Sequence, residues 1–135
     1  MKVLFVAGYG PIVPDDRGHD AAAFYEDALN IEFEHDGEYR HTGNLDGVKH
    51  FALWPLSQAA ESCFGTANWP AELPVPASWL EFDVDDIAGA TAELKSRGYT
   101  LLIENRKEPW GQQVTRLLSP EGQLVGLTYT PWMRE

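Results

Sequence analysis

The sequence holds a single cysteine, Cys63, in 135 residues. One cysteine can form neither an internal disulfide framework nor a zinc site built from several thiolates. A catalytic thiol would need a neighbouring histidine or a helix N-terminus to lower its pKa, and the surrounding segment AESCF (60–64) advertises neither. We therefore expect Cys63 to be a buried structural thiol.

Basic side chains are also scarce, because 10 Lys and Arg face 21 Asp and Glu, which gives a net charge of −11. A chain this acidic repels the phosphates of nucleic acids and anionic membranes, so we expect neither as a partner. A charged ligand would more readily be a cation. An acidic surface can also simply keep a protein soluble, so charge alone does not identify a ligand.

Long apolar runs are missing as well, since no stretch of 18 apolar residues exists and residues 1–10, MKVLFVAGYG, do not resemble a signal peptide. The default expectation is a cytoplasmic protein. There is no glycine-rich phosphate loop and no Ser-His-Asp ordering with supporting motifs. What the sequence does contain is 44% apolar residues, 12% of all residues being aromatic, which is enough for one packed domain.

Residues 79–132 show the clearest pattern. WLEFDVDD alternates apolar and polar positions, as expected of a half-buried strand. Asp85 or Asp86 can then cap a helix that stops at Gly98, because glycine adopts the left-handed conformation without a Cβ clash. A tight-turn sequence, SPEG, precedes the last strand. Three apolar runs after Gly98 predict three more strands: residues 99–103, 114–118 and 124–129.

The first half predicts the same succession of elements. We expect a strand, a loop, a helix and three strands: residues 2–7, 8–18, 20–29, 31–34, 38–42 and 48–56. DGVKHFALWP and EGQLVGLTYTP both combine a turn glycine with an apolar strand that ends at a proline, which indicates an internal duplication. The chain is thus predicted to be one α+β domain, 1–135, of two βαβββ modules (about 1–56 and 79–132) joined by a proline-containing connector, 57–78.

The order EFDVDD, helix, RG, strand, EPWGQ, strand, SPEG resembles the vicinal oxygen chelate superfamily, which includes glyoxalase I, the extradiol dioxygenases and the bleomycin-resistance proteins. The resemblance covers the second half closely and the first half by pattern. It implies that paired modules bend one mixed sheet into a cup around an active site or a ligand groove. It also implies a homodimer, with the groove at the subunit interface.

The enzymes of this superfamily hold a divalent metal with His, Gln or Glu from the inner strand faces, and such a site needs several ligands. The matching positions here hold Phe5, Trp79 and Gly126, and only His50 is left as a ligand. The resemblance therefore predicts no metal or other cofactor. It favours a binding protein over an enzyme, closest to the metal-independent bleomycin-resistance branch.

Tryptophan and carboxylate side chains at these positions predict an aromatic, acidic groove. Trp110 stands out because its loop-like setting, PWG, does not need a large aromatic residue for packing. Glu81 shares a strand face with Trp79, and an acid beside an aromatic floor suits a cation. The predicted ligand is a small aromatic or cationic molecule, such as an antibiotic or a metabolite. The predicted contacts are Trp110, Trp79, Gln112, Glu81, Trp54, His50, Trp69 and Phe5.

Two alternatives remain open at this point. The chain could be a metal-dependent lyase or isomerase of the glyoxalase kind, or a dioxygenase, with His50, Glu81 and Glu104 as the first ligands to consider. It could also be a structural dimer without a small ligand, in which the tryptophans pack the core and His50 is a hydrogen-bonded core histidine.

Overall fold

The computed structural model describes residues 1–134, which form one eight-stranded sheet in the order β2-β3-β4-β1-β5-β8-β7-β6. The strands are β1 (Val3–Val13), β2 (Glu34–Asp36), β3 (Tyr39–Thr42), β4 (Phe51–Pro55), β5 (Ser78–Val84), β6 (Ile103–Lys107), β7 (Gln113–Leu118) and β8 (Leu124–Tyr129). The helices are α1 (Gly18–Ala22), α2 (Leu56–Phe64) and α3 (Ile87–Ser96), with short turns of helix η1 (Asp15–Arg17), η2 (Ala23–Ala28) and η3 (Pro131–Met133).

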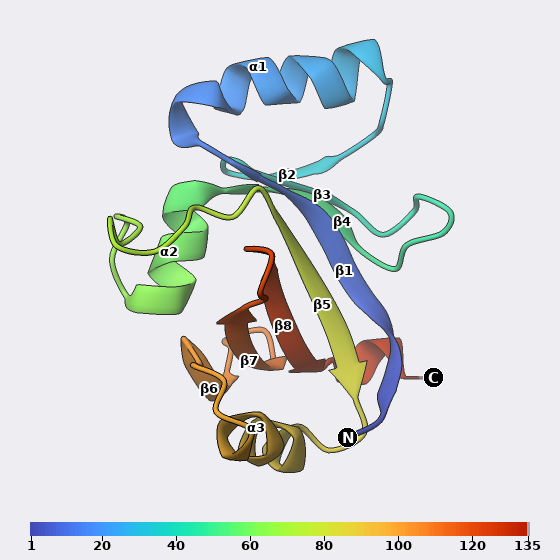
Figure 1. Ribbon diagram of the computed structural model, residues 1–135. Helices are drawn as coiled ribbons and strands as arrows, with labels where there is room; N and C mark the ends of the chain where they lie inside the picture. The colour runs from blue at the N-terminus through green and yellow to red at the C-terminus, as the bar shows by residue number, and fades with distance from the viewer. Residues whose placement is uncertain (135) are drawn as a thin grey trace.

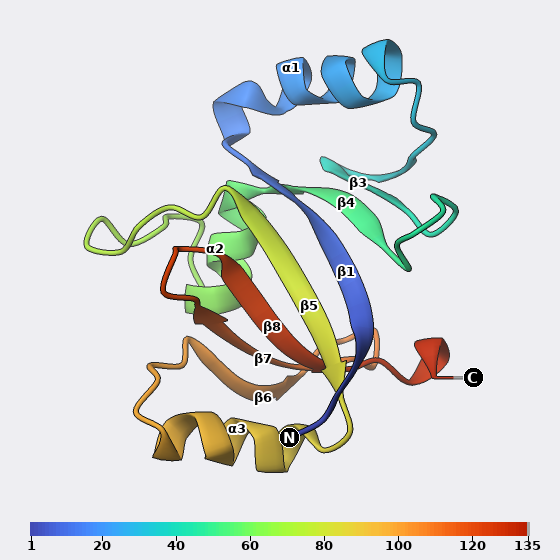
Figure 2. The same ribbon diagram turned by 45° about the vertical axis from the view of Figure 1, so that its right-hand side comes forward.

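The sheet consists of two βαβββ halves that meet at β1 and β5. These two strands are antiparallel, and each has the last strand of its own half as a parallel neighbour: β4 beside β1, and β8 beside β5. Figures 1 and 2 show β1 and β5 running side by side through the middle of a curved sheet. The predicted α+β fold with a curved mixed sheet is confirmed.

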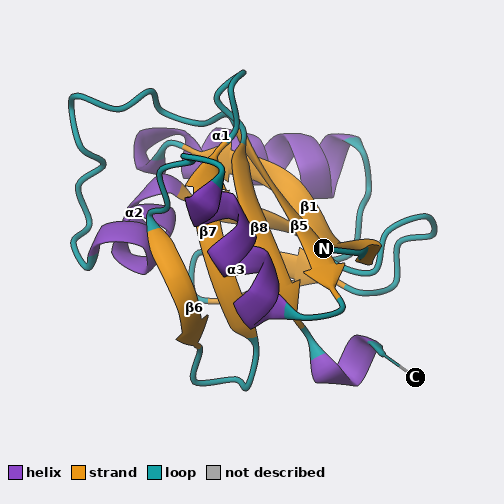
Figure 3. Cartoon of the chain, turned by 60° about the horizontal axis from the view of Figure 1, so that its bottom comes forward, coloured by secondary structure: helices purple, strands orange, loops and turns teal. Residues whose placement is uncertain are grey.

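The helices of the two halves cover the outer face of the sheet. Figure 1 shows α1 and α3 at opposite ends of the molecule, and Figure 3 shows α3 crossing β7 and β8. The contact under α3 is apolar, because Val84, Ile87, Ala90 and Leu127 are buried together there. Since Val84 lies on the opposite face of β5 from Trp79 and Glu81, α3 leaves the inner face of the sheet open.

The second half begins its helix as predicted. The Asp86 side chain caps α3 by accepting a hydrogen bond from the backbone N–H of Gly89. The strand after α3 was predicted at 99–103, but β6 spans Ile103–Lys107, so only Ile103 belongs to both. The backbone N–H of Tyr99 donates to the carbonyl of Leu94, so residues 98 and 99 close the helix end instead of pairing in the sheet.

The largest correction concerns residues 8–13, predicted as part of a loop. Strand β1 continues through them to Val13. Gly8 and Gly10 lie under the Trp79 indole, where a Cβ on Gly8 would stand 2.8 Å from the Trp79 ring. A Cβ on Gly10 would stand 1.8 Å from the Ala52 carbonyl oxygen. Both glycines therefore allow a close approach inside the sheet and are not turn residues.

Smaller boundary differences occur in the rest of the first half. The predicted strands 38–42 and 48–56 become the shorter strands β3 and β4, whereas β2 shares only Glu34 with the predicted strand 31–34. The predicted helix 20–29 begins earlier, at residue 15, and is divided among η1, α1 and η2. The helical turn expected in the connector is the full helix α2, which buries Ala59 and Cys63 beside Trp79. Burial raises the pKa of the Cys63 thiol to about 11, which suits a structural thiol.

Within residues 1–134, no helix has both the length and the apolar character that crossing a bilayer requires.

Candidate functional site

A cavity of about 710 Å³ lies on the inner face of the sheet. This volume falls in the range of roughly 300–1,000 Å³ that is usual for small-molecule sites. Six of the eight predicted contact residues line it: Trp54, Trp79, Glu81, His50, Trp110 and Gln112. Strand alternation on β5 brings Trp79 and Glu81 to this face, as the sequence predicts.

An ion pair between Glu81 and Arg116 forms the floor of the cavity. Arg116 lies on β7 with an exposed fraction of only 3%, and its Nη2 donates to Oε2 of Glu81 at 3.0 Å. The other carboxylate oxygen, Oε1, accepts a 3.1 Å hydrogen bond from Nε2 of Gln112. Each oxygen of Glu81 thus has a donor within the protein, and its charge is compensated by the guanidinium.

Gln112 connects this floor to the rim. Its Nε2 also donates to Oγ1 of Thr130 at 3.0 Å, and its Oε1 accepts from Nε1 of Trp110 at 3.1 Å. Gln112 is buried, whereas Trp110 is 60% exposed. Trp132, which also lines the cavity, is 52% exposed. Two large indoles therefore stand at the mouth, where core packing does not account for them.

Three donor atoms on the floor lack an acceptor within the protein. Nε and Nη1 of Arg116 and Nε1 of Trp79 are buried and make no hydrogen bond. Both side chains contact Trp54, whose ring lies 4.8 Å from the Arg116 guanidinium carbon and 5.8 Å from the Trp79 ring. A buried unpaired donor costs about 1–3 kcal/mol, so this corner of the site has unused hydrogen-bonding capacity.

The wall from the first module is a stack of aromatic rings. Tyr39 and His41 of β3 stack with His50, with ring centroids 5.2–6.2 Å apart. The Tyr39 hydroxyl and Nε2 of His50 share a 2.7 Å hydrogen bond. Burial lowers the pKa of His50, so the neutral imidazole is favoured. Burial, together with the negative charge of Glu81, raises the pKa of Tyr39.

The residues present do not fit the metal that the family's enzymes use. A Cβ on Gly126 would stand 3.1 Å from Cγ of Glu81 and 3.2 Å from Nη1 of Arg116, so the ion pair occupies the space that a longer side chain would need. Glu104 pairs with Lys95 at 2.9 Å on the surface and does not line the cavity. Across residues 1–134, no three His, Cys, Asp or Glu side chains converge as a metal site requires.

Two predicted contact residues do not line the cavity. Phe5 lies on β1 with the Lys49 ammonium 4.9 Å from its ring centroid, and Ala7 is the residue of β1 that reaches the cavity wall. Trp69 lies in the connector, where it packs edge-on against Phe64 and donates to the carbonyl of Pro74. The prediction for Phe5 came from the family resemblance, which placed a metal-ligand position of the first strand near it. The prediction for Trp69 came from its place in the connector, which does not fix where that segment packs.

Several lining residues were not predicted, among them Arg116, Tyr39, His41 and Trp132. Arg116 had a visible signal in the sequence, because it is the one charged residue inside the apolar run Val114–Leu118, and a buried charge requires a partner. His41 and Tyr39 gave no such signal. Their hairpin reaches the cavity through its pairing with β4, which places His41 opposite Ala52.

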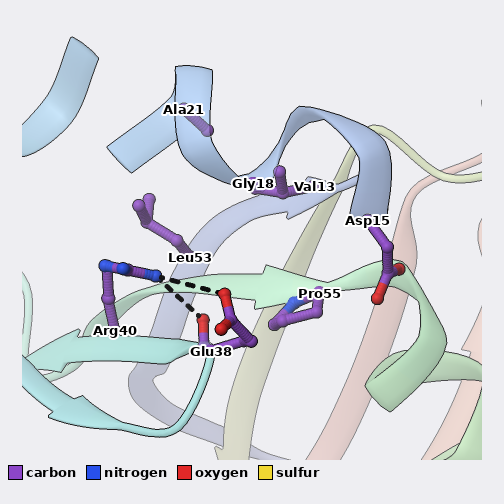
Figure 4. A pocket seen from close by; sticks show the side chains of 8 residues that line it. All are labelled: Val13, Asp15, Gly18, Ala21, Glu38, Arg40, Leu53 and Pro55. Atoms are coloured by element: carbon purple, nitrogen blue, oxygen red, sulfur yellow. Dashed lines mark hydrogen bonds and ion pairs between the residues drawn. The ribbon is translucent and has the colours of Figure 1, made fainter. Parts of the chain in front are cut away.

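A second, smaller cavity of about 120 Å³ lies on the outer face between α1 and β4. Figure 4 shows Arg40 pointing toward Glu38 across this space, and Asp15 on the other side. Both acids have partners within the protein, since Asp15 accepts hydrogen bonds from Ser57 and Glu38 lies 3.8 Å from Arg40. The cavity holds a surface ion pair and has no unpaired buried group.

Solved structures with the same fold share little sequence with this chain. A superfamily member from Vibrio splendidus 12B01 is 18% identical, with a TM-score of 0.58 over 93% of this chain and 97% of that one. A protein from Bacillus halodurans C-125 is 17% identical, with a TM-score of 0.59 over 93% and 94%. A Streptomyces coelicolor methylmalonyl-CoA epimerase, in complex with 2-nitronate-propionyl-CoA, is 14% identical, with a TM-score of 0.56 over 96% of both chains. These likenesses show the fold.

No protein with a curated function matches the chain in sequence. A family model does match, over residues 12–127, and it is described as the Glyoxalase/Bleomycin resistance protein/Dioxygenase superfamily. This match covers most of both βαβββ halves and the connector between them. The chain belongs to the Glyoxalase/Bleomycin resistance protein/Dioxygenase superfamily.

Proposed function

We propose that the protein binds a flat aromatic small molecule in the inner cavity, without a metal ion. The observation that carries this proposal is the composition of the cavity wall. Trp54, Trp79, Trp110 and Trp132 line one space of about 710 Å³, and Trp79 and Gly126 stand where the family's enzymes would place metal ligands. Flat apolar surfaces with a few placed polar groups suit a planar organic ligand.

The two exposed indoles give the ligand a route of entry. Trp110 and Trp132 lie at the mouth, whereas Trp79 is buried at the floor. A ring that enters can stack on the mouth indoles first and reach Trp54 afterwards. Because Nε1 of Trp110 donates a hydrogen bond to Gln112, the Trp110 ring is oriented before the ligand binds. Such preorganisation reduces the entropy that binding costs.

The binding role supports sequestration of a drug or a metabolite, and it involves no bond making. The homodimer predicted from the sequence stays a prediction, and it is compatible with this role. In a dimer, the exposed Trp110 and Trp132 could contact either the ligand or the second subunit. Their exposed fractions in the isolated chain are 60% and 52%.

The test is a fluorescence titration of the protein with planar aromatic compounds, which quench tryptophan emission on contact. Trp110→Ala should weaken binding roughly tenfold, because an aromatic contact contributes about 0.5–1.5 kcal/mol beyond the area it buries. Trp69→Ala is the matched control, since Trp69 lies outside the cavity. We expect the control to bind as the unchanged protein does.

Equal affinity in the unchanged protein and in Trp110→Ala would show that Trp110 does not contact the ligand. An absence of quenching by every planar compound would contradict the binding role itself. A divalent ion retained at about one per chain, with a catalytic activity lost on chelation, would favour the metal-dependent enzyme instead.

A further inference from the structure

We propose that the ligand carries a carboxylate, and that this group binds the buried guanidinium of Arg116. The inference rests on the proposed function, because it names the polar end of the same aromatic ligand. It also replaces the cation that the sequence alone favoured. That expectation assumed that the Glu81 carboxylate is free to meet a ligand.

Both carboxylate oxygens of Glu81 already have a donor within the protein. Oε2 accepts from Arg116 and Oε1 accepts from Gln112. A cationic ligand that used the remaining lone pairs of Glu81 would bring a second positive charge beside the buried guanidinium, which like-charge repulsion disfavours. The guanidinium therefore weakens the attraction of Glu81 for a positive charge.

The unused groups on the floor are all donors. A guanidinium has five N–H donors, and Nη2 of Arg116 is the one nitrogen of the three that has an acceptor. The indole N–H of Trp79 is also unpaired. Among the residues that line the cavity within 1–134, no buried side-chain acceptor is left unpaired. The complementary ligand group is thus one that supplies acceptors.

A carboxylate is the acceptor group that fits best. It is planar, carries two oxygens, and forms short charge-assisted hydrogen bonds with arginine. The Arg116 guanidinium lies over the Trp54 ring at 4.8 Å, so an aromatic ring bound among the tryptophans lies close to the guanidinium.

Charges at the mouth do not reverse this preference. Glu34 and Asp36 line the outer part of the cavity together with Lys49, and all three side chains are exposed. Water and salt screen exposed charges much more than buried ones. The exposed acids at the mouth therefore do not offset the unpaired donors of Arg116 at the floor.

The test compares three probes that share one ring: 2-naphthoate, 2-naphthamide and 2-naphthylmethylammonium. Isothermal titration calorimetry on the full chain measures each affinity. We expect 2-naphthoate to bind about tenfold more tightly than the amide, because hydrogen bonds to a charged group are about twice as strong as neutral ones. The ammonium should bind most weakly.

Two variants separate the roles of the ion pair. Glu81→Gln keeps the side-chain shape but removes the negative charge, so it should tighten 2-naphthoate several-fold. Glu81→Gln combined with Arg116→Gln removes both charges and leaves no unpaired charge in the core. In this double variant the carboxylate and the amide should bind about equally.

Equal binding of all three probes, tightest binding of the ammonium, or weaker 2-naphthoate binding in Glu81→Gln would each overturn the inference and leave the aromatic site in place. Failure of all three probes to bind would overturn both the inference and the proposed function. The order carboxylate, amide, ammonium, with its loss in the double variant, supports the inference.

Discussion

The floor of the cavity and the wall from the first module are built on different principles, although the two modules share one topology. The floor comes from the second module and is held by charge, with Glu81 and Arg116 paired at 3.0 Å and both side chains buried. The wall from the first module is an aromatic stack, in which Tyr39 and His50 share a 2.7 Å hydrogen bond. A duplicated fold therefore does not imply a duplicated site. The floor offers a buried ion pair, and the wall from the first module offers ring surface.

The largest effect should come from breaking the ion pair of the floor. Arg116→Met leaves Glu81 buried without its partner, and we expect a loss of about 3–5 kcal/mol in the free energy of unfolding. Urea denaturation measures this loss. The control is Arg97→Met, because Arg97 pairs with Glu93 on the surface, where an ion pair contributes less than about 1 kcal/mol. Similar losses in the two variants would contradict the contrast between buried and exposed pairs.

A somewhat smaller effect should come from adding a side chain at Gly10, where β1 lies close to β4. Gly10→Ala places a Cβ 1.8 Å from the Ala52 carbonyl oxygen, which is backbone and cannot move aside cheaply. We expect a loss of about 1–3 kcal/mol by the same urea measurement, as for overpacked cores. Gly43→Ala is the matched control, since its Cβ would have only one neighbour, at 3.5 Å. An unchanged stability of Gly10→Ala would show that β1 does not approach β4 as closely as described.

The wall from the first module should respond more weakly to a substitution. Tyr39→Phe removes the hydroxyl that is bonded to His50, and a neutral hydrogen bond contributes about 0.5–1.5 kcal/mol. The loss in urea should therefore be well below that of Arg116→Met. An equal or larger loss would mean that the first-module wall carries as much stability as the ion pair.

Acidification should act on the wall from the first module through the His50 imidazole. Burial lowers the pKa of His50 below its ordinary value of 6.5. Between the two values the unfolded chain binds more protons than the folded chain, so stability falls as the pH drops through this range. His50→Gln should flatten that part of the curve of unfolding free energy against pH. An unchanged slope in the variant would exclude His50 as its source.

The second module was more predictable than the first, for physical reasons. Its strand β5 alternates cleanly, the helix that follows has a capping aspartate, and the turn Ser119–Gly122 closes by a local hydrogen bond. These features are local, and the sequence displays them. In the first module, the sequence around Gly8 and Gly10 is typical of a loop, but both glycines lie inside β1. A side chain at Gly8 would collide with the Trp79 indole. That constraint comes from residue 79 and is not visible near residue 8.

The site shows the same division. Trp79 and Glu81 were placed correctly together, because strand alternation puts them on one face. The ion pair between Glu81 and Arg116 was not predicted. Glu81 lies on β5 and Arg116 on β7, and strand β8 separates the two in the sheet. Contacts between strands that are distant in sequence determine the charge of the floor. They turn a predicted acidic groove into one with compensated charge.

The proposed function requires that the inner cavity binds an aromatic ligand without a metal. The most direct measurement is calorimetric titration of the protein with 2-naphthoate, once after treatment with EDTA and once with added zinc or magnesium. We expect one binding event per chain, with the same affinity after EDTA treatment and with the added divalent ion. Binding that is lost in EDTA and restored by a divalent ion would contradict the proposed function.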